Sequence, residues 1–274
     1  MGKLACLIGL LIAVGACAET PTFTRGGGSI TVTNGVYTAV VSETNGALQR
    51  LATAAFGDQT LVNGGFTYSD IGLLAEGSHA FFGTSNAAEA TVAVKTEGET
   101  VIVSVEGSLA LPDGKLPPGA KWRYRFRYTF DQTPVVRAMA GAQTDTARPV
   151  APGFFATTMS VGGVNEWFAD TEKGMQWVDL GPENGRCFEM HTTPLRPERR
   201  RAGLLNHDNG AVVLLDNIRC APAGTLEDII FHSGGTGQVT VFLNWLDGQR
   251  QTAFEAGEWY DLSWDVSVSG QLPE

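Results

Sequence analysis

Two short segments collect most of the arginines of an otherwise acidic chain. Residues 121–148 contain six Lys and Arg against two Asp and Glu, and residues 186–201 contain five against two. The whole 274-residue protein has a formal net charge of -10. Arginine presents a planar fork of N–H donors that binds carboxylate and sulfate groups bidentately. The two segments are therefore the first candidates for a site that binds an anionic ligand.

The first segment alternates aromatic and basic residues from Trp122 to Phe130. Successive side chains of a β-strand point to opposite faces, so the aromatic side chains are predicted to lie in the core. Arg123, Arg125 and Arg127 would then stand about 6.6 Å apart on the other face, a spacing comparable to that of the charges on a carboxylated or sulfated polysaccharide. The alternative is that the arginines pair with acids of neighbouring strands, for which the candidates are Glu97, Glu99 and Glu106.

The second segment is a proline-punctuated loop, and loops on a rigid β-scaffold often carry function. Arg196, Arg199 and Arg201 could neutralise a uronate carboxylate while His191 moves a proton, which is the arrangement that β-elimination needs. A solvated basic loop without a ligand is the alternative.

Two further residues are candidates for proton transfer in such a reaction. Tyr124 belongs to the aromatic face of the first segment, opposite the arginines. His207 begins the stretch His207-Asp208-Asn209-Gly210, for which a turn between two strands is the competing interpretation.

Carboxylates paired beside tryptophan could hydrolyse a glycosidic bond. Pairs of this kind in the sequence are Glu166 with Asp170 near Trp167, and Glu255 with Glu258 near Trp259. Trp167 is also a candidate to stack on a sugar ring.

Composition excludes several classes of protein. Four Cys and four His are too few for zinc-finger arrays or iron–sulfur proteins, and a pI near 4.9 argues against a nucleic-acid partner. The sequence has no phosphate loop, dinucleotide fingerprint or Gly-x-Ser-x-Gly elbow. We expect no metal site of His residues and no cofactor; a structural calcium ion on Asp208, Asp216 or loop carbonyls is left open.

The N-terminus reads as an export signal over residues 1–18. Lys3 is followed by the apolar run Leu4–Gly15, which is too short for a permanent membrane span. Cleavage after Ala18 would leave a soluble protein, whereas the stretch Val14–Cys17 resembles a bacterial lipobox, in which Cys17 is acylated. The expected location is the periplasm, the outer-membrane surface or the medium, with membrane contact only through a lipid on Cys17.

Export also affects the interpretation of the remaining cysteines. In an oxidising compartment, Cys187 and Cys220 would most often pair as a disulfide, which would stabilise the fold by about 3–4 kcal/mol. A catalytic cysteine is the alternative.

The rest of the chain has the pattern of short strands separated by turns. Asn-Gly and Asp-Gly pairs, typical of hairpin turns, recur between runs of β-branched and aromatic residues. No segment after the signal shows a long helical stripe. We predict a flexible spacer over 19–28 and a single all-β domain over 29–270, folded as a large antiparallel β-sandwich.

The opening of this domain is more specific. The stretch Ile30–Val41, followed by Asn45-Gly46-Ala47-Leu48-Gln49-Arg50-Leu51, resembles the first hairpin of galactose-mutarotase-like supersandwiches. The resemblance implies a domain associated with carbohydrate, as in sugar epimerases, modules of polysaccharide lyases and glycosidases, and carbohydrate-binding units. Asn206-His207 is followed by Asp208-Asn209-Gly210, which departs from the Asn-His-x-x-Phe-type motif of mutarotases.

Together these patterns predict an exported protein that binds an anionic polysaccharide through the arginine row. A polysaccharide lyase or sugar epimerase is the enzymatic alternative, and a structural envelope lipoprotein is a second alternative.

Overall fold

The computed structural model describes residues 18–53, 87–109, 121–145, 148–150, 156–162, 165–179, 193–196, 198–221, 228–233, 238–244 and 252–270. These residues form strands and turns, with no helix among them. The strands are, in chain order, β1 (Thr22–Gly26), β2 (Ser29–Thr33), β3 (Tyr37–Ser42), β4 (Leu48–Thr53), β5 (Ala87–Glu97), β6 (Thr100–Leu109), β7 (Trp122–Phe130), β8 (Val135–Thr144), β9 (Arg148–Val150), β10 (Ala156–Gly162), β11 (Glu166–Thr171), β12 (Gly174–Asp179), β13 (Thr193–Pro194), β14 (Ala202–Asn206), β15 (Ala211–Ala221), β16 (Asp228–Ser233), β17 (Gln238–Asn244), β18 (Thr252–Phe254) and β19 (Tyr260–Ser269).

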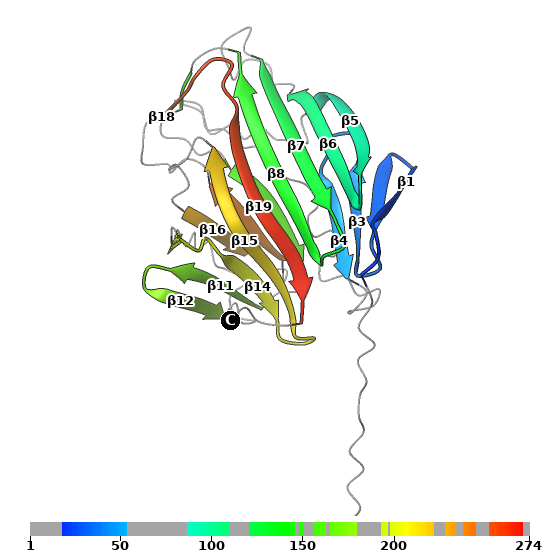
Figure 1. Ribbon diagram of the computed structural model, residues 1–274. Helices are drawn as coiled ribbons and strands as arrows, with labels where there is room; N and C mark the ends of the chain where they lie inside the picture. Colours follow the sequence, from blue (N-terminus) through cyan, green and yellow to red (C-terminus); the bar gives the residue numbers. More distant parts are fainter. Residues whose placement is uncertain are drawn as a thin grey trace, which may run out of the picture.

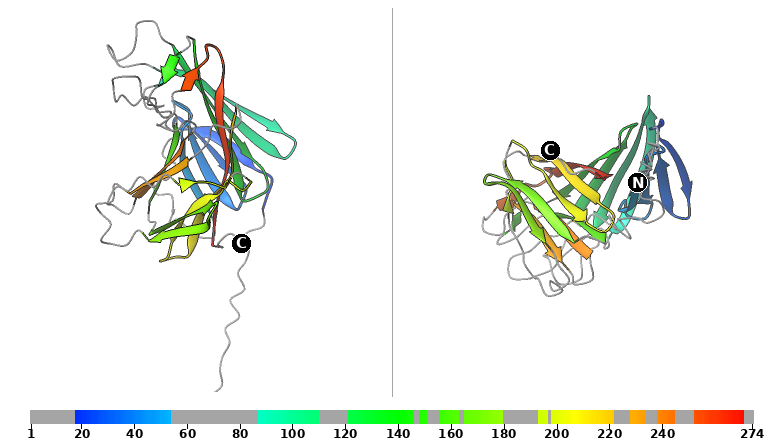
Figure 2. Two further views of the ribbon diagram at one scale, coloured as in Figure 1. Left: turned by 90° about the vertical axis from the view of Figure 1, so that its left-hand side faces the viewer. Right: turned by 90° about the horizontal axis from the view of Figure 1, so that it is seen from below.

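One large sheet dominates the molecule, with the strand order β12-β11-β14-β15-β19-β8-β7-β6-β5. Two four-stranded sheets, β1-β2-β3-β4 and β10-β17-β16-β13, lie on the same side of it (Figure 1, Figure 2). A small β18-β9 pair completes the described sheets. All neighbouring strands are antiparallel, as predicted for an antiparallel β-sandwich.

The strands of the large sheet have one apolar face because their sequences alternate with period two. Strand β19 alternates buried and half-buried side chains along its whole length. Strand β7 buries every aromatic side chain from Trp122 to Phe130 and leaves the residues between them exposed or half-buried. The predicted division of this strand into an aromatic core face and an arginine face is thus confirmed.

The core lies between the large sheet and strands β2–β4. The Tyr37 and Phe130 ring centroids are 6.1 Å apart across the two sheets. The buried Tyr128 hydroxyl donates to the Gly46 carbonyl at 2.9 Å. Gly46 has a φ of 76°, and a Cβ there would come within 2.6 Å of Val105. Only glycine combines this backbone conformation with such close packing.

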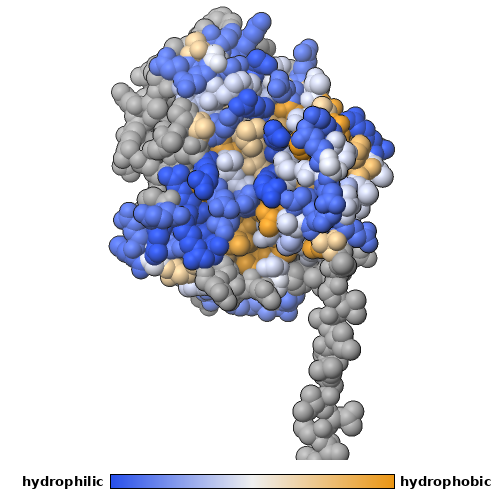
Figure 3. All heavy atoms as spheres, viewed as in Figure 1, coloured by the Kyte–Doolittle hydropathy of each residue, from blue (hydrophilic) through white to orange (hydrophobic). Residues whose placement is uncertain are grey.

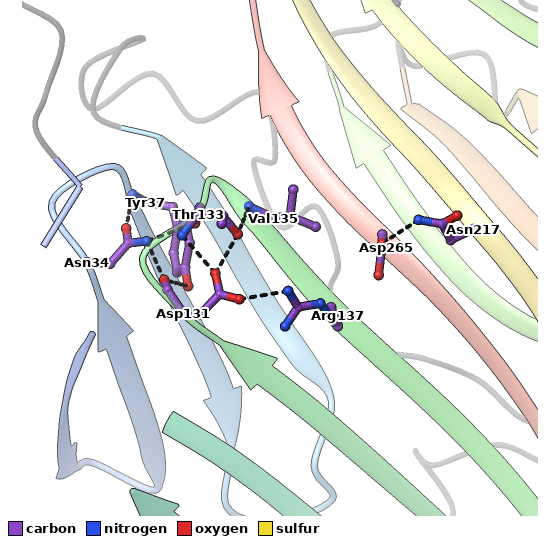
Figure 4. Close-up of polar contacts among 8 residues, drawn as sticks. All are labelled: Asn34, Tyr37, Asp131, Thr133, Val135, Arg137, Asn217 and Asp265. Carbon is purple, nitrogen blue, oxygen red and sulfur yellow. Dashed lines mark hydrogen bonds and ion pairs between the residues drawn. The ribbon is translucent and has the colours of Figure 1, made fainter. Parts of the chain in front are cut away.

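A buried asparagine joins the two layers at one end (Figure 4). The Asn34 side chain is 1% exposed and donates to the carbonyls of Asp131, at 2.8 Å, and Thr133, at 3.0 Å. Its own oxygen accepts the backbone N–H groups of Val36 and Tyr37, each at 3.0 Å. One side chain therefore satisfies four backbone groups from the β2–β3 and β7–β8 turns.

The Asp131 carboxylate belongs to the same junction. It accepts the Thr133 backbone N–H at 2.8 Å and forms an ion pair with Arg137 at 2.8 Å. Burial alone would raise the pKa of Asp131, but the hydrogen bonds from Thr133 and the nearby Arg137 outweigh burial and hold the pKa below its ordinary value.

The stretch predicted to be a spacer over 19–28 contains strand β1. Thr22–Gly26 pairs with β2 along its full length. Gly27 and Gly28, with φ of 61° and 76°, form the two-residue turn of this hairpin. The glycines that suggested a spacer are thus the residues that allow the tight turn.

Candidate functional site

The large sheet has a second face that is turned away from the core, which we call the outer face. It is directed toward the viewer in Figure 1, and Figure 3 shows hydrophilic residues along its flanks with more hydrophobic residues between them. The register places Arg125, Arg127, Asp261, Ser263 and other outward residues of β7, β8, β19 and β15 on this face. The arginine row of the sequence therefore meets residues that are more than a hundred positions away in the chain.

The best-anchored member of the row is Arg125. It forms a bidentate ion pair with Asp261, with Nε 3.0 Å from Oδ1, and its guanidinium lies 4.2 Å from the ring centroid of Trp259. Arg125 is on β7 and Asp261 on β19, so the pair crosses the intervening strand β8 at Gly141. A Cβ at position 141 would overlap Asp261 Oδ1. The bridge thus depends on a strand residue without a side chain.

Arg123 has partners on both neighbouring strands. Its guanidinium lies 3.3 Å from Glu106 on β6 and donates to the Gln143 side chain on β8 at 3.3 Å. The contact with Glu106 agrees with the alternative that arginines of the row pair with acids of neighbouring strands. A groove of about 1100 Å³ opens here at the strand ends, lined among others by Glu89, Glu106, Lys121, Arg123 and Asp145.

Arg127 and Arg219 differ from the other arginines of the outer face. Both are exposed, and neither makes a hydrogen bond or ion pair with any residue that the structure describes. They lie in one row across the sheet, because Arg127 pairs in register with Met139, Met139 with Ser263, and Ser263 with Arg219. Three strand spacings, about 14 Å, separate their backbones.

The charge of Arg127 makes only a minor contribution to the pKa of the Glu97 carboxylate. The pKa of Glu97 is lowered mainly by the hydrogen bond and the charge of Lys95, with a smaller contribution from Arg127. Arg127 therefore influences Glu97 only through its charge and donates no hydrogen bond to it.

Next to this row, an irregularity in β15 brings an amide to the outer face. The register of β15 with β19 shifts between Asp216 and Arg219, and Asn217 within the shift has a φ of 51°. Its side chain donates to Asp265 at 2.7 Å (Figure 4). Left-handed backbone is uncommon at a non-glycine residue and clusters at functional sites. Bulges in strands also often lie next to functional sites.

Two of the arginines predicted to bind substrate make structural contacts instead of standing free. Arg201 forms an ion pair with Asp216 on the next strand, with Nε 3.0 Å from Oδ2. Arg196 donates to the Thr171 carbonyl from both Nε, at 3.3 Å, and an Nη, at 3.2 Å, and it pairs with the buried Asp170 at 3.3 Å. Arg199 is exposed close to Arg196, whose carbonyl accepts its backbone N–H at 3.1 Å.

Two aromatic candidates lie within the core. Tyr124 is 0% exposed, and its hydroxyl has no hydrogen-bond partner among the described residues. Burial raises the pKa of Tyr124 to about 12. Trp167 is 2% exposed and also belongs to the main core cluster. Both side chains therefore lie on the core side of the large sheet, opposite its outer face.

The structure brings His207 next to Glu166. The His207 Nε2 lies 3.1 Å from a Glu166 carboxylate oxygen, and the His207 backbone N–H donates to Asn165 Oδ1 at 2.7 Å. The histidine side chain is 57% exposed, while that of Glu166 is 17% exposed. This pair lies at the end of the outer face formed by β11 and by the β14–β15 turn, where Asp208 is also exposed.

Trp177 stands beside an apolar cluster that was not predicted from the sequence. Trp177 is 40% exposed on the edge strand β12, and its ring centroid is 4.8 Å from that of the buried Phe168. Phe168 clusters with Leu205 and Val212 on the outer face. The alternation of residues around Phe168 and Trp177 would have indicated this patch only if it had been known which side chains of β11 point to the outer face.

Several predicted residues fall outside what the structure describes. His191, Cys187 and Cys17 lie outside the described residues, and of Cys220 only the backbone, in β15, is described. Among the described residues, no group of three or more His, Cys, Asp and Glu could hold a metal ion. No helix in the described part of the chain is long and apolar enough to cross a bilayer.

Comparison with known proteins relates this chain to others through structure. No protein-family model and no curated protein matches its sequence. A solved structure of galactose 1-epimerase from Lactobacillus acidophilus NCFM superposes with a TM-score of 0.56 at 10% identity, covering 91% of this chain and 98% of that one. The galactosidase domain of the alpha-galactosidase-sucrose kinase AgaSK superposes with a TM-score of 0.55 at 11% identity, covering 91% of this chain and 42% of that one. The chain therefore has the galactose-mutarotase-like β-supersandwich fold that its first hairpin resembled.

Proposed function

We propose that this protein binds an anionic, uronate-containing carbohydrate on the outer face of its large sheet. The observation that carries the proposal is the pair of exposed arginines, Arg127 and Arg219, which lie in one row and have no partner among the described residues. Exposed guanidiniums that have no partner among the described residues can donate hydrogen bonds to carboxylates of a ligand, whereas Arg125 and Arg201 are already paired with acids.

The floor between the two arginines suits a sugar. Ser263 and the half-buried Met139 separate them, so a hydroxyl and an apolar surface are both available there. Asp265 and Asn217 add hydrogen-bonding groups next to the row. The similarity in fold to a galactose 1-epimerase and a galactosidase domain supports a sugar ligand.

Titration calorimetry with oligogalacturonates tests the proposal. The substitutions Arg127→Ala and Arg219→Ala should each weaken binding about fivefold, as expected for the loss of ~1 kcal/mol from a charge-assisted contact. The loss should shrink as salt is added, because exposed charges are screened. Arg50→Ala is the matched control, since Arg50 is an exposed arginine on β4 in a different sheet.

Unchanged affinity in both variants, or equal binding of neutral maltooligosaccharides, would contradict this assignment. Binding that is lost equally in Arg50→Ala would indicate non-specific attraction to positive charge.

The His207–Glu166 pair favours a second candidate function, which is a polysaccharide lyase or sugar epimerase. A carboxylate at 3.1 Å from Nε2 holds the imidazole in a fixed orientation, as a proton-transfer group requires. In β-elimination, the base takes the proton at C5 of a uronate, a C4–C5 double bond forms, and the C4–O bond breaks with protonation of the leaving oxygen. An arginine on the uronate carboxylate would stabilise the charge that develops.

Ultraviolet absorbance of the unsaturated product distinguishes the two functions. If the protein is a lyase that uses this pair, absorbance should grow with time and His207→Ala should abolish the growth without changing the melting temperature. Stable binding with neither new absorbance nor a change in the anomer ratio would support the binding function and contradict the lyase and epimerase functions.

We propose further that the chain is exported and that Cys17 carries a lipid, on the basis of the apolar run and the Val14–Cys17 stretch. Intact-mass analysis of the protein from a bacterial membrane fraction should show the lipid mass, and Cys17→Ser should remove it. A mature chain that begins at Glu19 would contradict the lipid anchor but not export.

A further inference from the structure

Trp177 provides an exposed aromatic surface at one edge of the outer face. It is 40% exposed, and the ring of Phe168, itself 0% exposed, supports it from below at a centroid distance of 4.8 Å. Phe168 can take this position because its register partner is Gly203, where a Cβ would overlap the ring. A tryptophan held by a buried ring loses little freedom when a ligand stacks on it.

The register relates Trp177 to Arg127 and Arg219. Trp177 lies in the row that continues through Phe168, Gly203 and Leu214 to Ser267 on β19. Arg219 and Arg127 lie in the row of Ser263, four residues away along the same strand. With strand spacings of about 4.8 Å and a rise of about 3.4 Å per residue, the backbone of Trp177 is about 20 Å from that of Arg219 and about 32 Å from that of Arg127, before allowing for sheet twist.

We propose that the ligand is an extended acidic glycan, several sugar units long, that crosses the outer face from Arg127 through Arg219 to Trp177. This inference rests on the proposed function, because it concerns the length and course of the same ligand. One sugar unit cannot reach from the arginines to Trp177, whereas a chain can place carboxylates on both guanidiniums and stack a ring on the indole.

The charges along this course are compatible with an acidic chain. Between the arginine row and Trp177 lie Arg201 and Asp216, which neutralise each other in a half-buried ion pair. The apolar patch beneath Trp177, with Phe168 and Leu214, offers no charge of its own. The anionic groups are therefore recognised at one end and the apolar faces of the sugar rings at the other.

The test measures binding of oligogalacturonates from the disaccharide to the octasaccharide by calorimetry. For the intact protein, affinity should increase with chain length until the chain reaches Trp177. Trp177→Ala should lower the affinity for the octasaccharide on the order of tenfold and leave the disaccharide unaffected. Phe23→Ala is the control, because Phe23 is 37% exposed on β1 in another sheet.

The outcomes separate this inference from the proposed function. If Arg127→Ala weakens binding but Trp177→Ala changes no oligosaccharide, the site is short and the extended course is refuted. If no oligogalacturonate of any length binds, the proposed function itself fails. A loss in Phe23→Ala equal to that in Trp177→Ala would also refute the course.

Discussion

Replacing Gly141 with alanine should disrupt the bridge between Arg125 and Asp261. These residues lie on β7 and β19, and Gly141 lies between them on β8. A Cβ at position 141 would overlap Asp261 Oδ1 and come within 3.2 Å of Arg125 Cγ and Nε. The carboxylate cannot stay where it is, so the bidentate pair must open or shift.

The expected cost follows from two opposing effects. Overpacking a well-packed position costs about 1–3 kcal/mol, and the carboxylate that is displaced has only 19% of its side chain exposed. Gly141 does not have positive φ, so alanine fits its backbone and restricts the unfolded chain, which stabilises the fold by about 0.4–1 kcal/mol. The net loss in free energy of unfolding should be about 1–2 kcal/mol.

Urea denaturation followed by tryptophan fluorescence gives the free energy of unfolding of each variant. Asp261→Ala provides the second corner of a double-mutant cycle. On that background the overlap with Asp261 is gone and the Arg125 side chain, no longer held by the carboxylate, can move away, so Gly141→Ala should be neutral or slightly stabilising. Gly26→Ala is the control for the substitution itself, because a Cβ there would meet nothing within 4 Å.

Equal effects of Gly141→Ala with and without Asp261 would refute the reasoning, because the cost would then not come from the bridge. A Gly141→Ala variant as stable as the wild type in both backgrounds would show that the sheet face adjusts without loss.

Three further predictions concern Tyr124, Asn34 and Asn217. Tyr124→Phe should be neutral near pH 7, because the buried hydroxyl has no partner among the described residues. Burial raises the pKa of Tyr124 from 10.0 to about 12, so the unfolded chain loses this proton first and the free energy of unfolding falls between about pH 10 and pH 12. Urea denaturation should find this fall reduced in the variant. Asn34→Ala should lower the free energy of unfolding by about 3 kcal/mol or more in the same assay, because four backbone groups lose their partner; a loss below 1 kcal/mol would contradict its role as a junction. Asn217→Gly should be less destabilising than Asn217→Ala, because both lose the bond to Asp265 but only glycine adopts a φ of 51° without strain; the reverse order in thermal unfolding would show that the backbone there is not strained.

Much of the fold could be predicted because it is encoded locally. The alternation from Trp122 to Phe130 gave the direction of every side chain in β7, and the spacing of turn dipeptides indicated short antiparallel strands. The hairpin of β1 and β2 was missed because two consecutive glycines are compatible with both a flexible spacer and a tight turn. Only pairing with β2 distinguishes them.

The candidate site was predicted in part. The period of a strand was enough to place the arginines on a polar face, but predicting which of them pair with a described acid required the positions of those acids. Arg125 and Arg123 are held by Asp261 and Glu106, which no spacing rule connects to them. Arg219, which completes the proposed pair with Arg127, comes from a strand ninety-two positions further along the chain.

The sequence by itself determined which side chains of each strand face the core, because alternation is a property of the extended backbone. It also determined the acidic net charge and the exclusion of several classes of ligand. Only the tertiary structure decided how nine strands are ordered and registered, and hence which arginines meet carboxylates of the described residues and which do not. That order depends on contacts between residues far apart in the chain, which act only when the sheet as a whole forms.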